Sequence, residues 1–204
     1  KEILSYDFRE RAPQKAHEKM FIDKNGQKKP FKYGKITIKN ASLNGPLSVG
    51  TPGLVAGLWF LHKKHGTLPW AELLEPARKI AEEGFIIDNL LAKAIKKRAH
   101  VLKLFKESKK IFFRNSTPLK AGDRLVQKDL AQSIKTLQTH GKKAFYEGSI
   151  AKAIVKTTQK GGVLELNDLK MYQVKKHEPI TTEYKNYKIF SMPPPSSGGI
   201  HIGQ

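Results

Sequence analysis

Apolar residues recur with helical spacing in five stretches of the chain and predict five helices. Thr51 and Pro52 indicate the start of the first helix, because Thr is a common N-cap residue and Pro fits the first helical position. Pro76 lies inside the second stretch and predicts a kink or two abutting pieces. The expected helices cover residues 51–66, 70–83, 88–105, 126–140 and 149–160.

Alternating apolar and polar residues predict strands near both ends of the chain. Residues 1–9 alternate before a charged segment. Residues 180–189 alternate on both sides of Lys185 and Asn186, which is typical of a hairpin in which Asn adopts positive φ. Ala12 and Pro13 open a further short helix, and residues 25–45 form a polar loop or a weak hairpin. The expected fold class is therefore α+β, with residues 1–204 forming a single partial domain.

The composition excludes several kinds of site. The 204 residues include no Cys, so this stretch holds no disulfide, no zinc–thiolate or iron–sulfur site and no thiol nucleophile. No apolar run reaches the roughly 18 residues that a membrane span needs, so we expect no membrane-spanning helix. The first residues contain neither an initiator Met nor the apolar region of a signal peptide, which leads us to expect a fragment of a longer protein.

The charge of the chain is strongly positive, with 38 Lys and Arg against 18 Asp and Glu and a formal net charge of +20. Only six of the basic residues are Arg, although the planar guanidinium is the group that phosphate and base recognition favours. The lysines are spread along the chain, without zinc-finger spacing or an RNP-like aromatic run. A solvated basic surface is therefore favoured over nucleic-acid binding, and we expect no nucleic-acid partner.

Common metal and nucleophile motifs do not explain this sequence. His62 and His65 lie three residues apart, but Lys63 and Lys64 between them oppose a bound cation. Ser149 begins an S-x-x-K motif, yet the S-D-N and K-T-G motifs of β-lactamase-type enzymes do not accompany it. An N-cap role for Ser149 is favoured instead. We expect neither a metal site nor a cofactor.

Two segments carry candidate chemistry. The segment DFRE, residues 7–10, ends the first predicted strand, where Arg9 can hold a carboxylate through two N–H groups or join an exposed salt-bridge cluster. In the second segment, three prolines restrict the backbone and two glycines near its end leave the backbone free. Such a segment either presents hydroxyls and backbone N–H groups to a site or makes a tight structural turn. We call it the proline loop; its members are Pro193, Pro194, Pro195, Ser196, Ser197, Gly198 and Gly199.

These two segments and four weaker motifs resemble the large subunit of the γ-glutamyltranspeptidases, which are N-terminal-nucleophile hydrolases. Thr51 departs from the family pattern, where an apolar residue is more common. The matching motifs cover nearly the whole chain in family order: DFRERAP at 7–13, GTPG at 50–53, EPA at 75–77, VQKDLA at 126–131, FYEG at 145–148 and MPPPSSGG at 192–199.

The resemblance implies a helix-rich part of an αββα sandwich, made as a proenzyme that cleaves itself. A threonine at the new N-terminus of the small subunit is then the nucleophile, with its own α-amine as general base. It attacks the γ-glutamyl amide of a substrate such as glutathione and passes the γ-glutamyl group to water or to an amine. The resemblance assigns Arg9 to the α-carboxylate of that group and implies a periplasmic or secreted protein.

The threonine nucleophile matches no residue of this chain, so the resemblance implies no catalytic residue here and no activity of the 204 residues alone. One alternative is a related cephalosporin or glutaryl acylase or a poly-γ-glutamate depolymerase, although Arg9 favours a substrate with an α-carboxylate. The other alternative is a basic helical module that binds nucleic acid. In the proline loop we expect the glycines to allow close packing, so that Gly198→Val impairs folding or self-cleavage more than substrate affinity.

Overall fold

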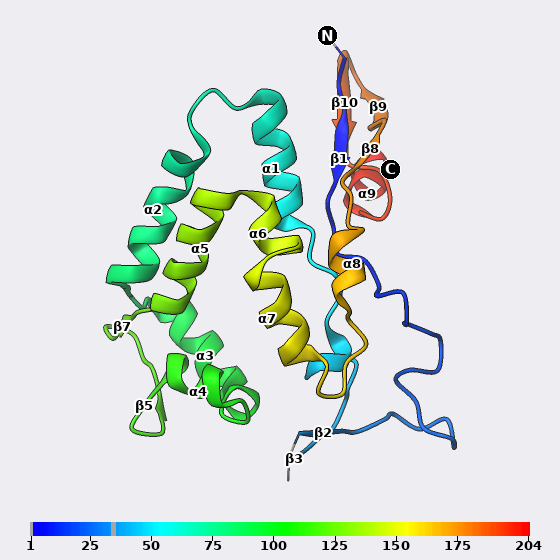
Figure 1. Cartoon of the computed structure of the whole chain (residues 1–204). Coiled ribbons are helices and arrows are strands. Elements are labelled where there is room, and N and C mark those ends of the chain that lie inside the picture. Colours follow the sequence, from blue (N-terminus) through cyan, green and yellow to red (C-terminus); the bar gives the residue numbers. More distant parts are fainter. Residues whose placement is uncertain (1, 34–35) are drawn as a thin grey trace.

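The computed structural model describes residues 2–33 and 36–204, and helices make up the body of the molecule (Figure 1). Two helices, α3 (Asn89–Leu102) and α4 (Lys106–Phe112), lie at the lower end of this body in the view of Figure 1. The helices above them are α1 (Leu54–His65), α2 (Trp70–Glu83), α5 (Lys128–His140), α6 (Lys142–Tyr146) and α7 (Ser149–Thr158). Shorter helical segments are the 3-10 turn Pro46–Ser48, α8 (Leu166–Lys170) and α9 (Gly198–Gly203).

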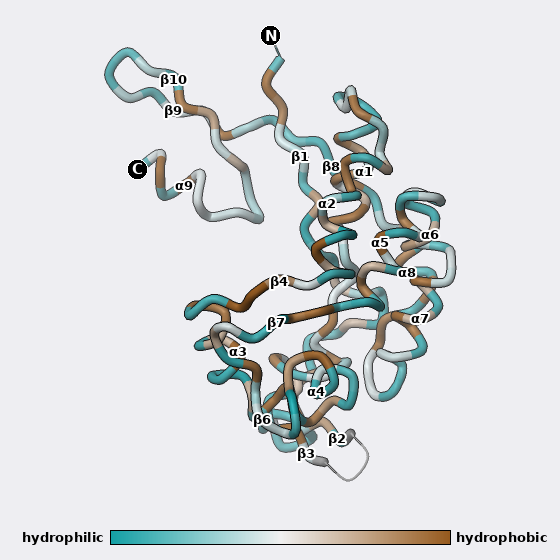
Figure 2. Tube along the Cα trace, turned by 90° about the vertical axis from the view of Figure 1, so that its left-hand side faces the viewer, coloured by the Kyte–Doolittle hydropathy of each residue, from teal (hydrophilic) through white to brown (hydrophobic). Residues whose placement is uncertain are grey.

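The strands are short, and those described form antiparallel pairs. The β1–β8 pair joins residues from opposite ends of the chain, with Ser5 opposite His177 and Asp7 opposite Lys175. Figure 2 shows the β9–β10 hairpin and α9 extending away from the helical body. The pairs are β1 (Ser5–Asp7) with β8 (Lys175–His177), β2 (Phe31–Tyr33) with β3 (Ile36–Ile38), β4 (Phe85–Ile86) with β7 (Arg124–Leu125), β5 (Phe113–Arg114) with β6 (Thr117–Pro118), and β9 (Ile180–Tyr184) with β10 (Tyr187–Ser191).

Local sequence signals account for several helix ends. The carboxylate of Asp88 caps α3 by accepting a hydrogen bond from the backbone N–H of Leu91 at 2.7 Å. Gly84 and Gly141 follow α2 and α5 with φ of 79° and 58°, a conformation that glycine adopts without steric cost. The indole N–H of Trp70, the first residue of α2, donates to the carbonyl of Leu137 on α5 at 3.0 Å and joins the two helices.

Among the residues that the structure describes, the buried apolar side chains form three clusters, and one of them supports the start of α1. In that cluster the rings of Tyr146 and Tyr172 stack with centroids 5.8 Å apart, and both residues are at most 4% exposed. The Tyr146 hydroxyl donates to the carbonyl of Pro52 at 2.8 Å and accepts from the N–H of Ala56 at 3.1 Å. Burial raises the pKa of Tyr146 to about 12, so this hydroxyl stays protonated at neutral pH.

The structure confirms the α+β class and most of the predicted elements. Helices lie in all five predicted stretches, and a two-residue loop joins β9 to β10, with Tyr184 opposite Tyr187. The segment 25–45 contains the small β2–β3 hairpin. Lys1, which the first predicted strand includes, lies outside the described residues, as do residues 34 and 35.

Three helix predictions need correction. The first helix begins at Leu54 rather than Thr51, because the backbone of Thr51 pairs with Arg11 through two hydrogen bonds of 2.7 and 3.1 Å. Helix α2 runs unbroken through Pro76, so the prediction of two abutting pieces is wrong. The third predicted helix, over residues 88–105, ends at Leu102, and α4, which follows it, was not predicted.

Three local predictions are also wrong. The segment after Pro13 forms i→i+3 turns instead of a helix, because so few apolar residues cannot offset the cost of helix nucleation. Gly148 is the N-cap residue of α7, and Ser149 is the first residue of this helix. Within the described residues, no side-chain hydrogen bond caps the helix. In the β9–β10 loop, the residue with positive φ is Lys185, at 52°, rather than Asn186.

Candidate functional site

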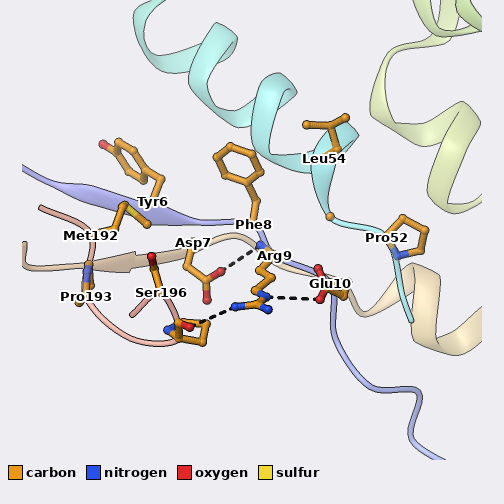
Figure 3. A pocket seen from close by; sticks show the side chains of 12 residues that line it. Tyr6, Asp7, Phe8, Arg9, Glu10, Pro52, Leu54, Met192, Pro193 and Ser196 are labelled. Carbon is orange, nitrogen blue, oxygen red and sulfur yellow. Dashed lines mark hydrogen bonds and ion pairs between the residues drawn. The ribbon is translucent and has the colours of Figure 1, made fainter. Parts of the chain in front are cut away.

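Strand β1 leads directly into the candidate site and sorts the DFRE side chains onto two sides. Asp7 is 5% exposed, whereas the Arg9 side chain is 57% exposed. Figure 3 shows Tyr6 and Phe8 projecting to one side of the segment and Asp7 and Arg9 to the other, as alternation along an extended chain requires. The extended backbone therefore separates packing side chains from polar ones.

The guanidinium of Arg9 connects the two segments that carry the candidate chemistry. It donates from Nη1 to the carbonyl oxygen of Pro195 at 3.1 Å and from Nε to Oε1 of Glu10 at 3.3 Å (Figure 3). Arg9 and Pro195 are 186 residues apart in sequence. An arginine has five N–H groups in a planar fork, so these two bonds leave three N–H groups for a ligand.

The backbone of Arg9 is held by two buried side chains. Its N–H donates to Oδ1 of Asp7 at 2.9 Å, and its carbonyl accepts from the hydroxyl of Tyr172 at 2.7 Å. Nη2 of Arg11 donates to Oδ2 of Asp7 at 2.9 Å, and Nε2 of His177 lies 3.8 Å from the same oxygen. Burial by itself raises the pKa of Asp7, but the Arg9 N–H and the Arg11 guanidinium outweigh it and hold this pKa below its usual value.

Two glycines of the α1 region allow the DFRE segment to pack closely. A Cβ on Gly53 would lie 2.0 Å from the Tyr172 hydroxyl and 2.1 Å from the carbonyl oxygen of Phe8. A Cβ on Gly57 would lie 2.1 Å from the Phe8 ring. Real Cβ atoms do not approach other atoms this closely, so Gly is required for this packing. The GTPG motif therefore has a structural role beside the site.

The DFRE segment, the start of α1 and the proline loop surround a pocket of about 570 Å³ (Figure 3). The Arg9 guanidinium is the cationic group at this pocket, and apolar atoms from Phe8, Leu54 and Met192 form part of its wall. Such a pocket suits a small organic anion with an aliphatic portion. Residues 2–33 and 36–204 contain no group of three or more His, Cys, Asp or Glu side chains placed to hold a metal ion.

Within the proline loop, the close approach occurs at Gly199. A Cβ on Gly199 would lie 2.3 Å from the carbonyl oxygen of Met192, whereas a Cβ on Gly198 would have its nearest neighbour, Oγ of Ser196, at 3.7 Å. The expected close packing at Gly198 is therefore wrong, because this residue is exposed at the start of α9. Pro193, Pro195 and Ser196 line the pocket, but Pro194, Ser197, Gly198 and Gly199 do not.

The other candidates lie away from this pocket. Nε2 of His62 is 2.8 Å from the carbonyl oxygen of Leu68, and its ring packs beside Trp70 with centroids 5.2 Å apart. His62 therefore has a packing role in the α1–α2 connection. Ser149 lies in a groove between α5 and α7.

Sequence reasoning missed Tyr172. It follows α8 and is 163 residues from Arg9, so no local pattern associates the two residues. A buried Tyr in a loop suggests a hydrogen-bonded hydroxyl, but the partner of that hydroxyl depends on the tertiary structure.

Comparison with known proteins identifies the fold. The structure matches the “Crystal Structure of Helicobacter pylori gamma-Glutamyltranspeptidase” with a TM-score of 0.90 and 40% sequence identity, over 98% of this chain and 55% of that chain. The fold is thus that of the helix-rich part of an N-terminal-nucleophile hydrolase. The family model described as “Gamma-glutamyltranspeptidase” matches residues 1–204. The chain belongs to the γ-glutamyltranspeptidase family.

Curated relatives agree with this assignment. The “Glutathione hydrolase proenzyme” of Escherichia coli strain K12 is 42% identical over 200 residues, which are 97% of this chain and 33% of that protein. The protein of the same name in Bacillus subtilis strain 168 is 41% identical over 205 residues, which are 100% of this chain and 33% of that protein. The chain spans about a third of the length of these relatives.

Proposed function

We propose that this chain is part of the large subunit of a γ-glutamyltranspeptidase proenzyme that hydrolyses glutathione and related γ-glutamyl compounds. In this proposal a threonine of the small subunit, outside the 204 residues, attacks the γ-glutamyl amide, and its α-amine accepts the hydroxyl proton. The resulting γ-glutamyl ester is transferred to water or to an amine acceptor. Two relatives named as glutathione hydrolase proenzymes support both the activity and the cleavage of a precursor.

The observation that carries the proposal is the position of Arg9. Its guanidinium lies at a pocket between DFRE and the proline loop, with three N–H groups left for a ligand. A planar guanidinium suits a carboxylate through two parallel hydrogen bonds. Arg9 thereby favours a donor with an α-carboxylate, such as a γ-glutamyl compound, over an acylase substrate that lacks one.

The location of the protein is proposed on family resemblance alone, as periplasmic or secreted. Among the residues that the structure describes, no helix combines the length and apolar character that crossing a membrane requires.

Substitution of Arg9 in the complete proenzyme tests the proposed function. Arg9→Ala removes a charge-assisted hydrogen bond worth about 1.5–3 kcal/mol, so KM for γ-glutamyl-p-nitroanilide should rise roughly 10- to 150-fold. Arg9→Lys should raise KM less, because an ammonium retains the charge but cannot form the planar pair. Both variants should still cleave themselves, because cleavage involves no free glutamyl carboxylate.

The control donor is 4-aminobutyryl-p-nitroanilide, which lacks the α-carboxylate. Its turnover should change much less in both Arg9 variants than turnover of the γ-glutamyl donor. Equal losses for the two donors would contradict the carboxylate role. Failed self-cleavage would instead indicate that Arg9 stabilises the fold through Glu10 and Pro195.

A further inference from the structure

The exposed side chain of Arg9 is attached to a backbone that is held on both sides. The carboxylate of Asp7 accepts from its N–H at 2.9 Å, and the hydroxyl of Tyr172 donates to its carbonyl at 2.7 Å. Both groups come from buried residues, Asp7 at 5% and Tyr172 at 4% exposed. The peptide units on either side of the Arg9 Cα are therefore fixed relative to the protein interior.

Tyr172 can hold this position because its own ring is fixed. The ring stacks on Tyr146 with an interplanar angle of 21° and belongs to the core cluster of Ala56 and Leu169. Burial raises the pKa of Tyr172, so its hydroxyl is a proton donor at neutral pH. Gly53 leaves room for this hydroxyl, because a Cβ at that position would lie 2.0 Å from it.

Asp7 holds the N–H side of the Arg9 backbone, and the orientation of its carboxylate is itself fixed by neighbouring residues. One oxygen of its carboxylate accepts from the Arg9 N–H, while the other accepts from Nη2 of Arg11 at 2.9 Å. Nε2 of His177 on β8 lies 3.8 Å from that second oxygen. With both oxygens occupied, the carboxylate has little freedom to rotate away from Arg9.

We propose that Tyr172 and Asp7 are positioning residues for Arg9, which they orient toward the pocket through its main chain. This inference rests on the proposed function, in which Arg9 holds the α-carboxylate of the γ-glutamyl donor. The side chain of Arg9 is long and 57% exposed, so ordering it upon substrate binding costs conformational entropy. A fixed backbone, together with the bonds to Glu10 and Pro195, reduces the number of conformations that binding must remove.

Tyr172→Phe in the complete proenzyme is the direct test, because it removes only the hydroxyl and retains the stacked ring. The kcat/KM for γ-glutamyl-p-nitroanilide should fall roughly 2- to 12-fold, as expected for one neutral hydrogen bond, and most of the change should lie in KM. The same substitution in an Arg9→Ala background should have little effect on this donor, because the group that it positions is gone. Turnover of 4-aminobutyryl-p-nitroanilide should change little in either background.

Tyr146→Phe is the matched control. Tyr146 is the other ring of the stacked pair, and the substitution removes its buried hydroxyl. That hydroxyl makes two hydrogen bonds, to Pro52 and Ala56 and not to Arg9. The substitution should lower the melting temperature at least as much as Tyr172→Phe, while the ratio of kcat/KM between the two donors stays unchanged. A merely structural role of Tyr172 would make Tyr172→Phe and Tyr146→Phe behave alike.

The outcomes separate this inference from the proposed function. If Arg9→Ala lowers turnover of the γ-glutamyl donor much more than turnover of the control donor, but the effects of Tyr172→Phe and Arg9→Ala on the γ-glutamyl donor simply add, the positioning role is overturned and the carboxylate role stands. If Arg9→Ala lowers turnover of the two donors equally, both are overturned.

Asp7 provides a second, independent variant. Asp7→Asn retains a carbonyl oxygen for the Arg9 N–H, whereas Asp7→Ala removes both acceptor oxygens. Asp7→Asn should therefore recover at least part of the donor discrimination that Asp7→Ala loses. Equal discrimination by Asp7→Ala and the unsubstituted enzyme would overturn the role of Asp7.

Discussion

Two adjacent glycines in the proline loop have different surroundings. Gly199 is buried, and a Cβ there would lie 2.3 Å from the carbonyl oxygen of Met192 and 3.1 Å from Oγ of Ser191. Gly198 is exposed, and a Cβ there would lie no closer than 3.7 Å to its nearest neighbour, Oγ of Ser196. The sequence SSGG presents both glycines as equivalent, but only one of them faces a backbone carbonyl.

Gly199→Ala should therefore destabilise the proline loop, and Gly198→Ala should not. The added methyl at Gly199 must displace backbone atoms, a change that typically costs about 1–3 kcal/mol in a packed region. We expect less self-cleaved proenzyme and a lower melting temperature for Gly199→Ala, measured by gel electrophoresis and thermal denaturation. Gly198→Ala is the matched control; equal loss in both variants would contradict the assignment of close packing to Gly199.

Among the helices, α2 and α5 are joined by a polar contact at their interface. The carboxylate of Glu75 accepts from Nε and Nη2 of Arg78 on the same helix, each at 2.8 Å, and from Nε2 of Gln138 on α5 at 2.9 Å. The same Gln138 nitrogen donates to the carbonyl of Ala71 at 2.8 Å. Hydrogen bonds from Arg78 and Gln138 lower the pKa of Glu75 from 4.5 to about 2.

This lowered pKa predicts a pH-dependent contribution of Glu75 to stability. A carboxyl group with a lowered pKa in the folded state stabilises the fold above its unfolded value of 4.5, and this stabilisation is lost as the pH falls toward about 2. The difference in melting temperature between the unsubstituted protein and Glu75→Gln should therefore be full above pH 4.5 and shrink below it. The effect should be small, because the Glu75 side chain is 36% exposed.

Glu83→Gln provides the control for the change in net charge. Glu83 is exposed on the same helix, and its side chain forms no ion pair within the part of the chain that the structure describes. A Glu75→Gln difference that stays constant from neutral pH down to about pH 2.5, or that Glu83→Gln reproduces, would show that the ionised Glu75 contact is not responsible.

For the molecule as a whole, activity should require more than these 204 residues. The pocket presents Arg9 for binding, but the resemblance places the threonine nucleophile in a small subunit that matches no part of this chain. We expect the purified 204-residue chain to release no p-nitroaniline from γ-glutamyl-p-nitroanilide, whereas the complete proenzyme should do so after self-cleavage. Turnover by the 204 residues alone, at a rate proportional to their concentration, would contradict this expectation.

The sequence alone determined the features that depend on neighbouring residues. Helical spacing identified the stretches that contain α1, α2, α3, α5 and α7, and alternation identified the β9–β10 hairpin, because side-chain periodicity follows directly from backbone geometry. The motifs around Arg9 and in the proline loop identified the family, which the comparisons confirm. The start of α1 was predicted less accurately, since the buried Thr51 pairs with Arg11 instead of capping this helix.

Tertiary structure alone decided which distant residues meet. The contact of Arg9 with Pro195 spans 186 residues and that with Tyr172 spans 163, and no local pattern encodes either. The same holds for Gly53, Gly57 and Gly199, whose need for glycine comes from atoms of other segments. Sequence periodicity reports which side of an element is apolar, whereas the partner on that side depends on how all elements pack together.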